Sequence, residues 1–378
     1  MAWQEVVITM SFRKEIVMLA NQPDTNIREI GRRFKVSPKT IHKWLGRYLE
    51  NGDEGLGDRS RRPHQSPKRS SKDIEFKVLK VRESHPAWGA RKIGARLKAL
   101  GEIAIPVDST IHEILRRHGL IDPRESAKHK AWKRFEHAEP NQLWQMDFKG
   151  WFTVGADVKC HPLTILDDHS RFVVCLEACA NQRTETVQHH LTDKFRRYGL
   201  PERMTMDNGS PWGNDAEHRY TPLTVWLIRL GIGVSHSRPY HPQTQGKDER
   251  FHRTLKAEAL RGRQFRDMEQ AQQRFDEWLP IYNQQRPHQA IAMAVPASRY
   301  RISWRAFPEA LPSIEYAAGD EVRRVQEKGE VSYKGNRIVL GKAFHRYPVA
   351  FRPTSKEGIV EVYFCHHRIT KIDLNDLH

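Results

Sequence analysis

Residues 163–176 read Leu-Thr-Ile-Leu-Asp-Asp-His-Ser-Arg-Phe-Val-Val-Cys-Leu, and this stretch decides the fold of the largest part of the chain. Two apolar runs, 163–166 and 172–176, flank the polar segment 167–170. This pattern predicts two strands joined by a tight turn. We expect Asp167 and Asp168 to be structural, because Asp and Ser side chains supply the local hydrogen bonds that such a turn needs.

The neighbouring segments extend this pattern into a domain over 140–302. Trp144, Met146 and Phe148 bracket Asp147 in another strand-like segment, and a short strand at 203–206 runs into Asp207. Strands mixed with helices in this way indicate an α/β domain. The remaining elements expected here are a strand at 232–235 and helices at 184–198, 221–230, 243–262 and about 267–284.

Residues 1–50 predict an all-α helix-turn-helix domain. Ser37-Pro38 opens its last helix, since Ser caps helices and Pro fits the first helical position. Ile41 and Trp44 form the apolar side of this helix, and a basic, polar face lies elsewhere on it. Local sequence leaves a plain three-helix bundle as an open alternative. The residues expected to contact DNA are Lys39, Thr40, Lys43 and Arg47.

A basic linker over 51–72 follows, rich in Gly, Pro, Ser and Arg. Arg59, Arg61 and Arg62 can follow a phosphate backbone or a minor groove, and a solvated tether is the alternative interpretation.

Residues 73–122 predict a second helix-turn-helix domain. Trp88 to Ile93 begins its second helix, Asp108 opens the third, and Gly119 is placed to end it. Two such domains joined by a basic linker indicate a bipartite DNA site, and a second linker spans 123–139. The DNA contacts expected here are Arg91, Lys92, Thr110, His112, Arg116 and Arg117.

Residues 315–374 predict a small β-barrel domain at the C-terminal end. Turn sequences at Gly335-Asn336 and Glu357-Gly358 separate short apolar segments. The expected strands are 331–333, 337–340, 347–351 and 359–364.

The composition of the 378-residue chain narrows the function classes. It has 63 Lys and Arg against 46 Asp and Glu, a net charge of +17. Such a charge favours a polyanionic partner, most simply nucleic acid, with an acidic membrane surface as the alternative. We expect no membrane helix and no signal peptide, because charged residues interrupt every apolar run. Four scattered cysteines make no disulfide framework, which favours a reducing cytoplasm.

Three carboxylates stand in unusual local settings. Asp147 lies in an apolar strand, Asp207 ends a strand, and Glu249 lies in a charged helix. Three oxygen donors on different elements suit Mg²⁺, and a pair of ions can promote in-line phosphoryl displacement. Each acid alone has an ordinary explanation as a turn cap or a solvated residue. Spacing alone would not select these three from the 46 acids.

Several motifs together resemble those of bacterial insertion-sequence transposases with a retroviral-integrase-type catalytic core. The resemblance covers about residues 10–300. The motifs are Trp144-Gln-Met-Asp147-Phe148, Leu166-Asp-Asp-His-Ser-Arg-Phe172, Asp207-Asn-Gly-Ser-Pro-Trp212, His236 to Lys256, Asn283-Gln-Gln-Arg-Pro-His288 and Pro296, with Gly55 to Pro63 and Trp88 to Ile93 in the N-terminal domains.

The resemblance implies an RNase H-like core in which Asp147, Asp207 and Glu249 form a D-D-E triad. Two Mg²⁺ ions, or Mn²⁺, would be bridged by Asp147 and held by the other two acids. Asp248 falls on a position that is usually apolar in the family. The interval from Asp207 to Glu249 is longer than in the best-known integrases, which puts the loop geometry after Pro211 in doubt.

Residues around Glu249 are expected to hold the DNA end. Glu249, Arg253 and Lys256 share one helical face, and a solvated salt bridge is the alternative explanation of this pattern. Tyr240 and His241 can stack on a terminal base or serve as turn residues. The remaining expected contacts are Lys247 and Arg250.

The resemblance therefore implies a Mg-dependent DNA transposase, which we expect in the bacterial cytoplasm, associated with the nucleoid. It would bind the terminal inverted repeats of its element as double-stranded DNA, cleave the ends, and join the 3′-hydroxyls to target DNA. A homo-oligomer, at least a dimer, is expected because two ends must be joined. A retroviral-type integrase would carry a zinc module and a ribonuclease H would need no tandem DNA-binding domains. The remaining alternative is a DNA-binding regulator with an inactive core.

Overall fold

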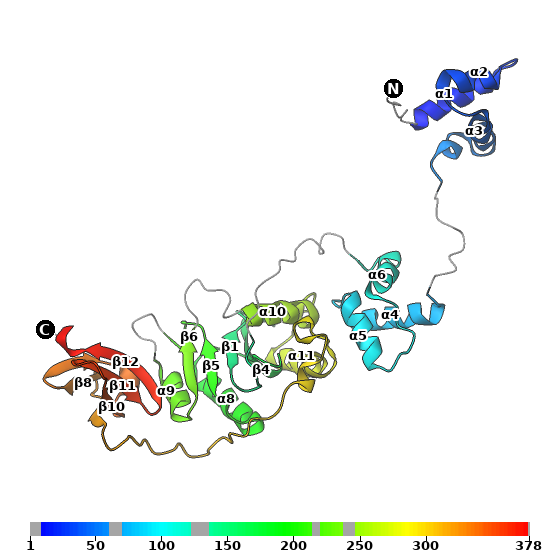
Figure 1. Ribbon diagram of the computed structural model, residues 1–378. Coiled ribbons are helices and arrows are strands. Elements are labelled where there is room, and N and C mark those ends of the chain that lie inside the picture. The colour runs from blue at the N-terminus through cyan, green and yellow to red at the C-terminus, as the bar shows by residue number, and fades with distance from the viewer. Residues whose placement is uncertain (1–8, 60–69, 122–135, 214–219, 237–245, 377–378) are drawn as a thin grey trace. The chain divides into compact units, whose positions relative to one another are not determined.

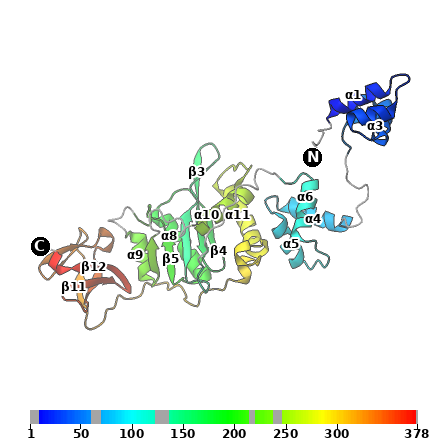
Figure 2. The same ribbon diagram turned by 45° about the horizontal axis from the view of Figure 1, so that its top comes forward.

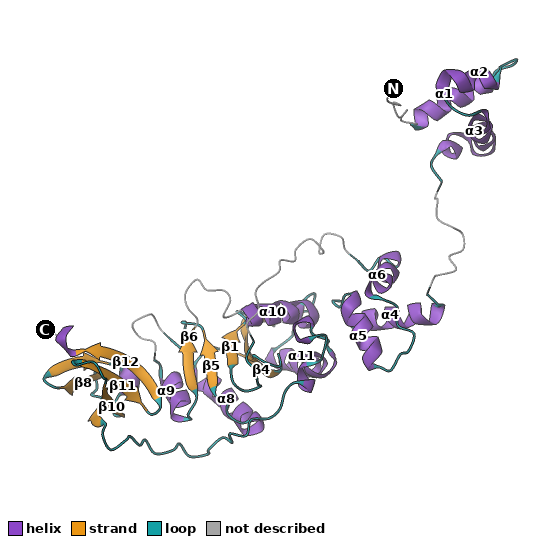
Figure 3. Ribbon diagram, in the orientation of Figure 1, coloured by secondary structure: helices purple, strands orange, loops and turns teal. Residues whose placement is uncertain are grey.

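A computed structural model describes residues 9–59, 70–121, 136–213, 220–236 and 246–376. The chain divides into two compact units, Met1–Arg69 and Ser70–His378. Figure 1 shows the elements in chain order, and Figure 3 shows the helices and strands by type. Across the described ranges, no helix combines the length and the apolar character that crossing a membrane would require.

The first unit contains three α-helices in its described part, as predicted. Ser37 caps the third helix by accepting the Thr40 N–H at 3.2 Å, and Pro38 occupies its first turn. Gly31 lets the turn before this helix approach closely, because a Cβ there would lie 2.7 Å from the Val36 carbonyl oxygen. The elements are α1 (Met10–Ala20), α2 (Ile27–Phe34), α3 (Pro38–Asn51) and the 3₁₀ turn η1 (Gly52–Leu56).

The second unit opens with another small helical domain, also as predicted. Its core is formed around Trp88, Ile93 and Ile111, all fully buried. Gly119 has a positive φ of 68° directly after the last helix, as a glycine that ends a helix does. The helices are α4 (Lys72–Ser84), α5 (Ala90–Ala99) and α6 (Asp108–Arg117).

A mixed sheet forms the centre of the second unit. The long strand β3 pairs antiparallel with β1, β2 and β4, and β1, β5 and β6 then run parallel to one another. The predicted strand–turn–strand over 163–176 is confirmed as β3 and β4. The strands are β1 (Trp144–Phe148), β2 (Phe152–Val154), β3 (Val158–Asp167), β4 (Val173–Cys179), β5 (Arg203–Met206) and β6 (Gly233–His236). Only β2 was not expected from the sequence.

Separate apolar clusters line the two faces of this sheet. Leu163 and Ile165 belong to a cluster with α8 and α9 residues, whereas Leu166 packs with Phe251 and Trp278 of α10 and α11. This change of face along β3 follows from the alternation of side chains in a strand. The helices are α8 (Thr184–Tyr198), α9 (Pro222–Arg229), α10 (Gly246–Leu255) and α11 (Met268–Pro280).

The two long helices predicted after residue 240 end earlier than expected. α10 gives way to the π-helical turn η2 (Lys256–Leu260), and α11 to the π-helical turn η3 (Ile281–Gln285). Arg261 and Arg286 donate their N–H groups to Lys256 and Ile281, five residues back. The 3.6-residue repeat of apolar residues, which predicts an α-helix, does not predict where such wider turns occur. Residues 243–245 lie outside the described part.

The C-terminal segment is antiparallel, but its closure into a barrel is not confirmed. Four strands pair in the order β12-β11-β10-β7, and β8 and β9 form a separate hairpin. Within the described residues, no pairing joins β7 to β12. The strands are β7 (Glu321–Arg324), β8 (Glu330–Tyr333), β9 (Asn336–Val339), β10 (Pro348–Pro353), β11 (Ile359–Phe364) and β12 (His367–Asp373), with short 3₁₀ turns η4 (Gln289–Ile291), η5 (Pro296–Ser298), η6 (Lys342–Phe344) and η7 (Leu374–Asp376) elsewhere.

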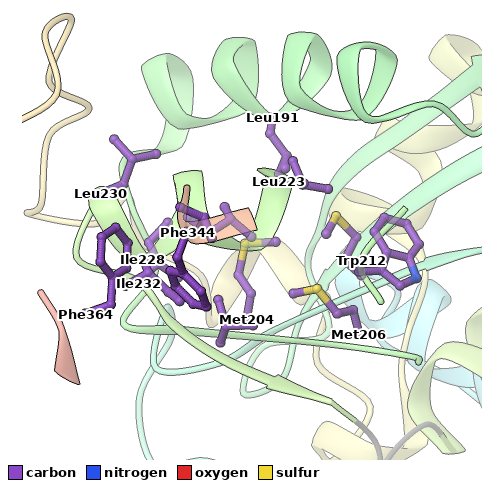
Figure 4. Packing of buried hydrophobic residues seen from close by; sticks show 14 of the residues in the cluster. Leu191, Met204, Met206, Trp212, Leu223, Ile228, Leu230, Ile232, Phe344 and Phe364 are labelled. Atoms are coloured by element: carbon purple, nitrogen blue, oxygen red, sulfur yellow. The ribbon is translucent and has the colours of Figure 1, made fainter. Parts of the chain in front are cut away.

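This C-terminal sheet shares an apolar cluster with the central sheet. Phe344 and Phe364 lie beside Ile228 and Ile232 (Figure 4), and all four are buried. Tyr220 adds a polar contact, since its hydroxyl lies 3.0 Å from His367 Nε2. One apolar cluster therefore joins α8, α9 and the C-terminal sheet, whereas α10 and α11 pack in the separate cluster on the other face.

Asn283 fastens the end of α11 to the sheet. Its side chain accepts the Val173 N–H at 2.9 Å and donates to the Val173 carbonyl at 3.0 Å. Both residues are buried, so the amide takes the place of a missing strand neighbour at β4.

Replacing Asn283 with Ala should therefore destabilise the second unit by about 2–4 kcal/mol, because two buried backbone groups lose their partners. Chemical denaturation followed by circular dichroism measures this loss. Gln273→Ala, on the exposed side of α11, is the control and should change stability by no more than about 0.5 kcal/mol. Equal effects of the two substitutions would contradict the role of Asn283.

Candidate active site and DNA-binding surfaces

Asp147 and Asp207 lie at the same edge of the central sheet. Trp144 and Gln145 of β1 pair in parallel with Met204 and Thr205 of β5. Each aspartate follows two residues after Gln145 or Thr205, and parallel strands end at one edge. The register therefore places Asp147 of β1 beside Asp207, which directly follows β5.

Glu249 reaches this edge from α10. Phe251 and Leu255 of this helix are buried, whereas Glu249 is exposed. His252, three residues after Glu249, lies with its Nε2 2.9 Å from the Thr164 hydroxyl and its Nδ1 4.0 Å from an Asp147 carboxylate oxygen. The Thr164 hydroxyl proton is donated to the Asp147 carbonyl at 2.9 Å, so His252 must donate from Nε2. Burial, with a contribution from Lys149, lowers the His252 pKa to about 4, which keeps the ring neutral.

The three acids share one electrostatic environment. Burial, followed by the charge of Asp207 and a smaller effect of Glu249, raises the Asp147 pKa to about 7, against a lowering hydrogen bond from the Phe148 backbone. Like charges that raise a pKa in this way lie near one another, and the arrangement is unfavourable in the absence of a cation. Other contacts in the fold must therefore keep these three carboxylates close together.

Asp207 is oriented by its own turn. One carboxylate oxygen accepts the Gly209 N–H at 2.9 Å and also the indole N–H of Trp212. Trp212 is buried and stacks on Phe148 with ring centroids 5.4 Å apart. The buried indole therefore links the Asp207 carboxylate to the strand that carries Asp147.

Asp248 and Glu249 point to different environments. Asp248 is 2% exposed, and its Oδ1 has no hydrogen-bond partner. Burial, reinforced by Asp147 and Asp168, raises its pKa well above the ordinary range. The exposed neighbour Glu249 is therefore the acid of this pair that a bound ion and DNA can reach.

The carboxylate oxygens of Asp147, Asp207 and Glu249 are ligands that suit a divalent cation. Their side chains do not converge on a single point. Among the residues that the structure describes, no group of three or more His, Cys, Asp or Glu side chains is arranged to hold a metal. Carboxylate oxygens that repel one another and raise the Asp147 pKa are nevertheless the ligands whose charge a hard divalent cation would neutralise.

The expected DNA contacts of the first unit lie on α3 and after it. Lys39 and Lys43 are exposed, and Thr40 and Arg47 are half-buried. Arg59 is exposed near the end of the described residues, whereas Arg61 and Arg62 lie outside them.

In the second helical domain the expected contacts are mostly accessible. Arg91, His112, Arg116 and Arg117 are exposed, and Thr110 is half-buried. All three of these guanidinium groups have carboxylate partners: Arg91 lies 3.9 Å from Asp108, Arg116 binds Glu113, and Arg117 binds Glu75 at 2.8 Å.

Lys92 differs from these residues. Burial and the nearby Arg286 lower its pKa to about 8. This half-buried amine is therefore a poor candidate for a solvent-facing contact.

Around the acids, Arg250, Arg253 and Lys256 are exposed, as a DNA-facing surface requires. Lys247 is not, because its ammonium group is bound to the carboxylate of Asp168 and its side chain is only 16% exposed. Tyr240 and His241 lie outside the described residues.

Sequence reasoning missed several residues near the acids. Trp212 and His252 lie inside motifs that carry the family resemblance, but the sequence assigns neither of them a role. Lys149 was not singled out, yet burial and the charge of Lys256 lower its pKa. Its position two residues after Asp147, beyond the end of the strand, is the one local signal in the sequence.

Family matches cover almost every part of this arrangement. Residues 12–64 match a helix-turn-helix domain and 40–115 a homeodomain-like domain. Residues 137–242 and 230–296 match integrase core domains, and 320–377 match the C-terminal domain of the IS481 family transposases.

Individual relatives are more distant. The chain is 23% identical over 249 residues to an uncharacterized 31.7 kDa protein of insertion element IS407 from Burkholderia multivorans, covering 65% of this chain and 86% of that one. It is 29% identical over 120 residues to the Gag-Pro-Pol polyprotein of mouse mammary tumor virus, covering 32% of this chain and 6% of the polyprotein.

Among solved structures, an intasome of simian T-cell lymphotropic virus has a TM-score of 0.37 at 16% identity, covering 77% of this chain and 97% of that one. The catalytic core of BIV integrase has a TM-score of 0.30 at 22% identity, covering 42% of this chain and 92% of that one. The family matches confirm the resemblance to bacterial insertion-sequence transposases with an integrase-type, RNase H-like core.

The raised pKa of Asp147 predicts a pH dependence of stability without metal. Because the folded-state pKa of about 7 exceeds the ordinary value of 3.8, the folded chain holds the proton more tightly. This acid therefore destabilises the fold progressively as pH rises from about 4 to 7. Relative to Asp147→Asn, the wild type should lose about 2–4 kcal/mol over this range, less than the full shift because the side chain is 24% exposed.

Denaturation in EDTA at several pH values, for both proteins, measures this difference. Mg²⁺ should restore the wild type but not Asp147→Asn. Parallel pH profiles for the two proteins would show that Asp147 does not occupy a desolvated, negatively charged environment.

Proposed function

We propose that this transposase-like chain binds the terminal inverted repeats of a mobile element, cleaves the ends, and joins the freed 3′-hydroxyls to target DNA. The observation that supports the proposal is that Asp147 and Asp207 lie at one sheet edge, where burial, followed by the charges of Asp207 and Glu249, raises the Asp147 pKa to about 7. Accessible basic residues on α3 and α6 of the same chain support DNA binding.

In this proposal each domain has its own role. Residues 1–50 and 73–122 bind the element end, with 51–72 and 123–139 as linkers. Residues 140–302 perform the chemistry, and 315–374 form a separate C-terminal domain. The integrase-core matches support a polynucleotidyl-transferase type of activity for the central part.

Two Mg²⁺ ions, or Mn²⁺ in their place, would be held by Asp147, Asp207 and Glu249 and would supply Lewis-acid activation at the reacting phosphate. The chain's own residues prepare this site. Trp212 and Gly209 orient Asp207, and the Thr164–His252 contact ties the helix of Glu249 to the backbone of Asp147.

The exposed cations beside the acids bind the DNA backbone in this proposal. Arg253 and Lys256 lie on the face of Glu249, and Lys149 is close enough to Lys256 for their charges to interact. Hydrolysis adds water across one P–O bond and frees a 3′-hydroxyl. That oxygen then attacks a target phosphodiester, so that one P–O bond forms as another breaks, without a covalent enzyme intermediate.

The partners in this proposal are two DNA ends, a target duplex and a second copy of the chain. Two ends must be held together for joining, so an active homo-oligomer follows from the reaction itself. The chain would act at the bacterial nucleoid.

Substituting Asp147→Asn, Asp207→Asn or Glu249→Gln should lower end cleavage and strand transfer at least about 100-fold while leaving end binding unchanged, since each removes a ligand charge without removing a DNA contact. A labelled duplex carrying the element's end, incubated with Mg²⁺ or EDTA, measures both products. Asp157→Asn, at an exposed aspartate, is the matched control. Full activity in any triad variant would remove that residue from the site, and binding without cleavage in the wild type would favour a DNA-binding regulator.

The first helical domain generates a separate prediction. Replacing Lys39 and Lys43 together with Ala should weaken end binding and lower the slope of log affinity against log salt by roughly two, because two phosphate contacts are lost. Lys14→Ala, an α1 lysine paired with Asp53, serves as the control and should change the slope little. An unchanged slope in the double variant would show that α3 does not face the DNA.

A further inference from the structure

Asp168 is a buried carboxylate that the proposed chemistry does not use. It lies in the turn between β3 and β4 and is 0% exposed. Its Oδ1 accepts the Gln145 amide at 2.8 Å and the Lys247 ammonium. Its Oδ2 accepts the backbone N–H of His137 at 2.9 Å and lies 3.1 Å from the ring Nδ1 of the same residue. Both oxygens are therefore engaged.

The donors to Oδ1 come from the two elements that must be aligned for catalysis. Gln145 lies two residues before Asp147 on β1, and Lys247 lies two residues before Glu249 on α10. A single oxygen atom thus holds both elements within a few residues of their acids.

Breaking the contact between Asp168 and Lys247 would cost electrostatic free energy. Burial alone would raise the pKa of Asp168, but the charge and hydrogen bond of Lys247, with the His137 contacts, outweigh it and lower the pKa. Lys247 and Asp168 form an ion pair in which the carboxylate is fully buried, so removing either partner would leave the other group without its counter-charge in the interior. The first turn of α10 would then have to move to bring the remaining group to water.

The neighbouring Asp167 provides an internal comparison. It is equally buried, and it accepts the Asn141 N–H at 2.7 Å together with the backbone N–H at 2.8 Å and hydroxyl at 2.5 Å of Ser170. None of these donors lies on β1 or α10. Asp167 shapes the turn, whereas Asp168 connects the turn to both acid-bearing elements.

We propose that Asp168 is a positioning residue that sets the separation of Asp147 and Glu249 by binding Gln145 and Lys247 through one carboxylate oxygen. The inference rests on the proposed function, in which these two acids hold the same ions. It also assigns Lys247 to the alignment of α10 and not to direct DNA contact.

The test measures metal binding as well as activity in the full-length chain. Asp168→Asn and Lys247→Met should each raise the Kd for Mn²⁺, followed by electron paramagnetic resonance, about 10–100-fold, as loss of a residue that orients metal ligands typically does. The double variant should lose no more than the worse single variant, because the two groups act as a unit. Single-turnover cleavage should fall in parallel, with end affinity unchanged.

Asp167→Asn is the matched control, with the same change of charge one residue away. It should lower the melting temperature yet keep the Kd for Mn²⁺ within about twofold at temperatures where it is folded. Unchanged Mn²⁺ binding in Asp168→Asn would overturn the proposal. So would an equal loss of Mn²⁺ binding in Asp167→Asn, because it would show general loosening of the turn.

The metal readout separates this proposal from the proposed function. If the wild type binds Mn²⁺ but cleaves no element end, the transposase proposal is contradicted. The Kd values of the variants for Mn²⁺ then still decide whether Asp168 is a positioning residue. A wild type that binds no Mn²⁺ at all would overturn both.

Discussion

The repulsion among Asp147, Asp207 and Glu249 is the constraint on which the rest of the second unit depends. Burial, followed by the charges of Asp207 and Glu249, raises the pKa of Asp147, so the charged form of this acid is disfavoured at the half-buried sheet edge. A fold that keeps the three carboxylates there must fasten each supporting element independently. Trp212 does so for the Asp207 turn, and the Thr164–His252 contact does so between the sheet and α10.

The helix that carries Glu249 is held at both ends by buried ion pairs. Lys247 binds Asp168 near its first turn, and beyond its last turn Glu258 accepts the Arg286 guanidinium at 2.9 Å. Asn283 lies in the same π-helical turn that leads to Arg286 and is itself fixed to β4. Buried pairs of this kind add little net stability, but they specify one arrangement, because an unpaired charge is costly in any other. The motif from Asn283 to His288 thus links the end of α11 to the turn after α10 and to β4.

The sequence could predict the features that depend on neighbouring residues. It could not predict the features that depend on contacts between residues distant in the chain. Local apolar patterns predicted the strand–turn–strand over 163–176 and the helix at 184–198. The start of the helix after Ser37 was predicted because serine is a common capping residue. β7 was missed because Glu321–Arg324 is mostly charged, and β12 was missed because the two isoleucines of His367–Asp373 do not alternate with polar residues as in a half-buried strand. Their pairing with β10 and β11 comes from tertiary contacts. The choice of the three acids came from motif resemblance, and the engagement of Lys247 by Asp168, 79 residues away, has no local signal.

The same repulsion explains why DNA, metal and protein would have to come together for catalysis. A phosphodiester approaching three carboxylates is repelled unless cations intervene, and the combined positive charge of two divalent ions would exceed the negative charge of the three carboxylates. Lys149 and Lys256 already interact as like charges beside the acids, so a phosphate between them would relieve a second repulsion. Each bound component therefore lowers the electrostatic cost of the next. In the proposed reaction, the net charge of +17 would attract DNA over distance, and the acids beside the cations would favour a phosphodiester together with its metal ions.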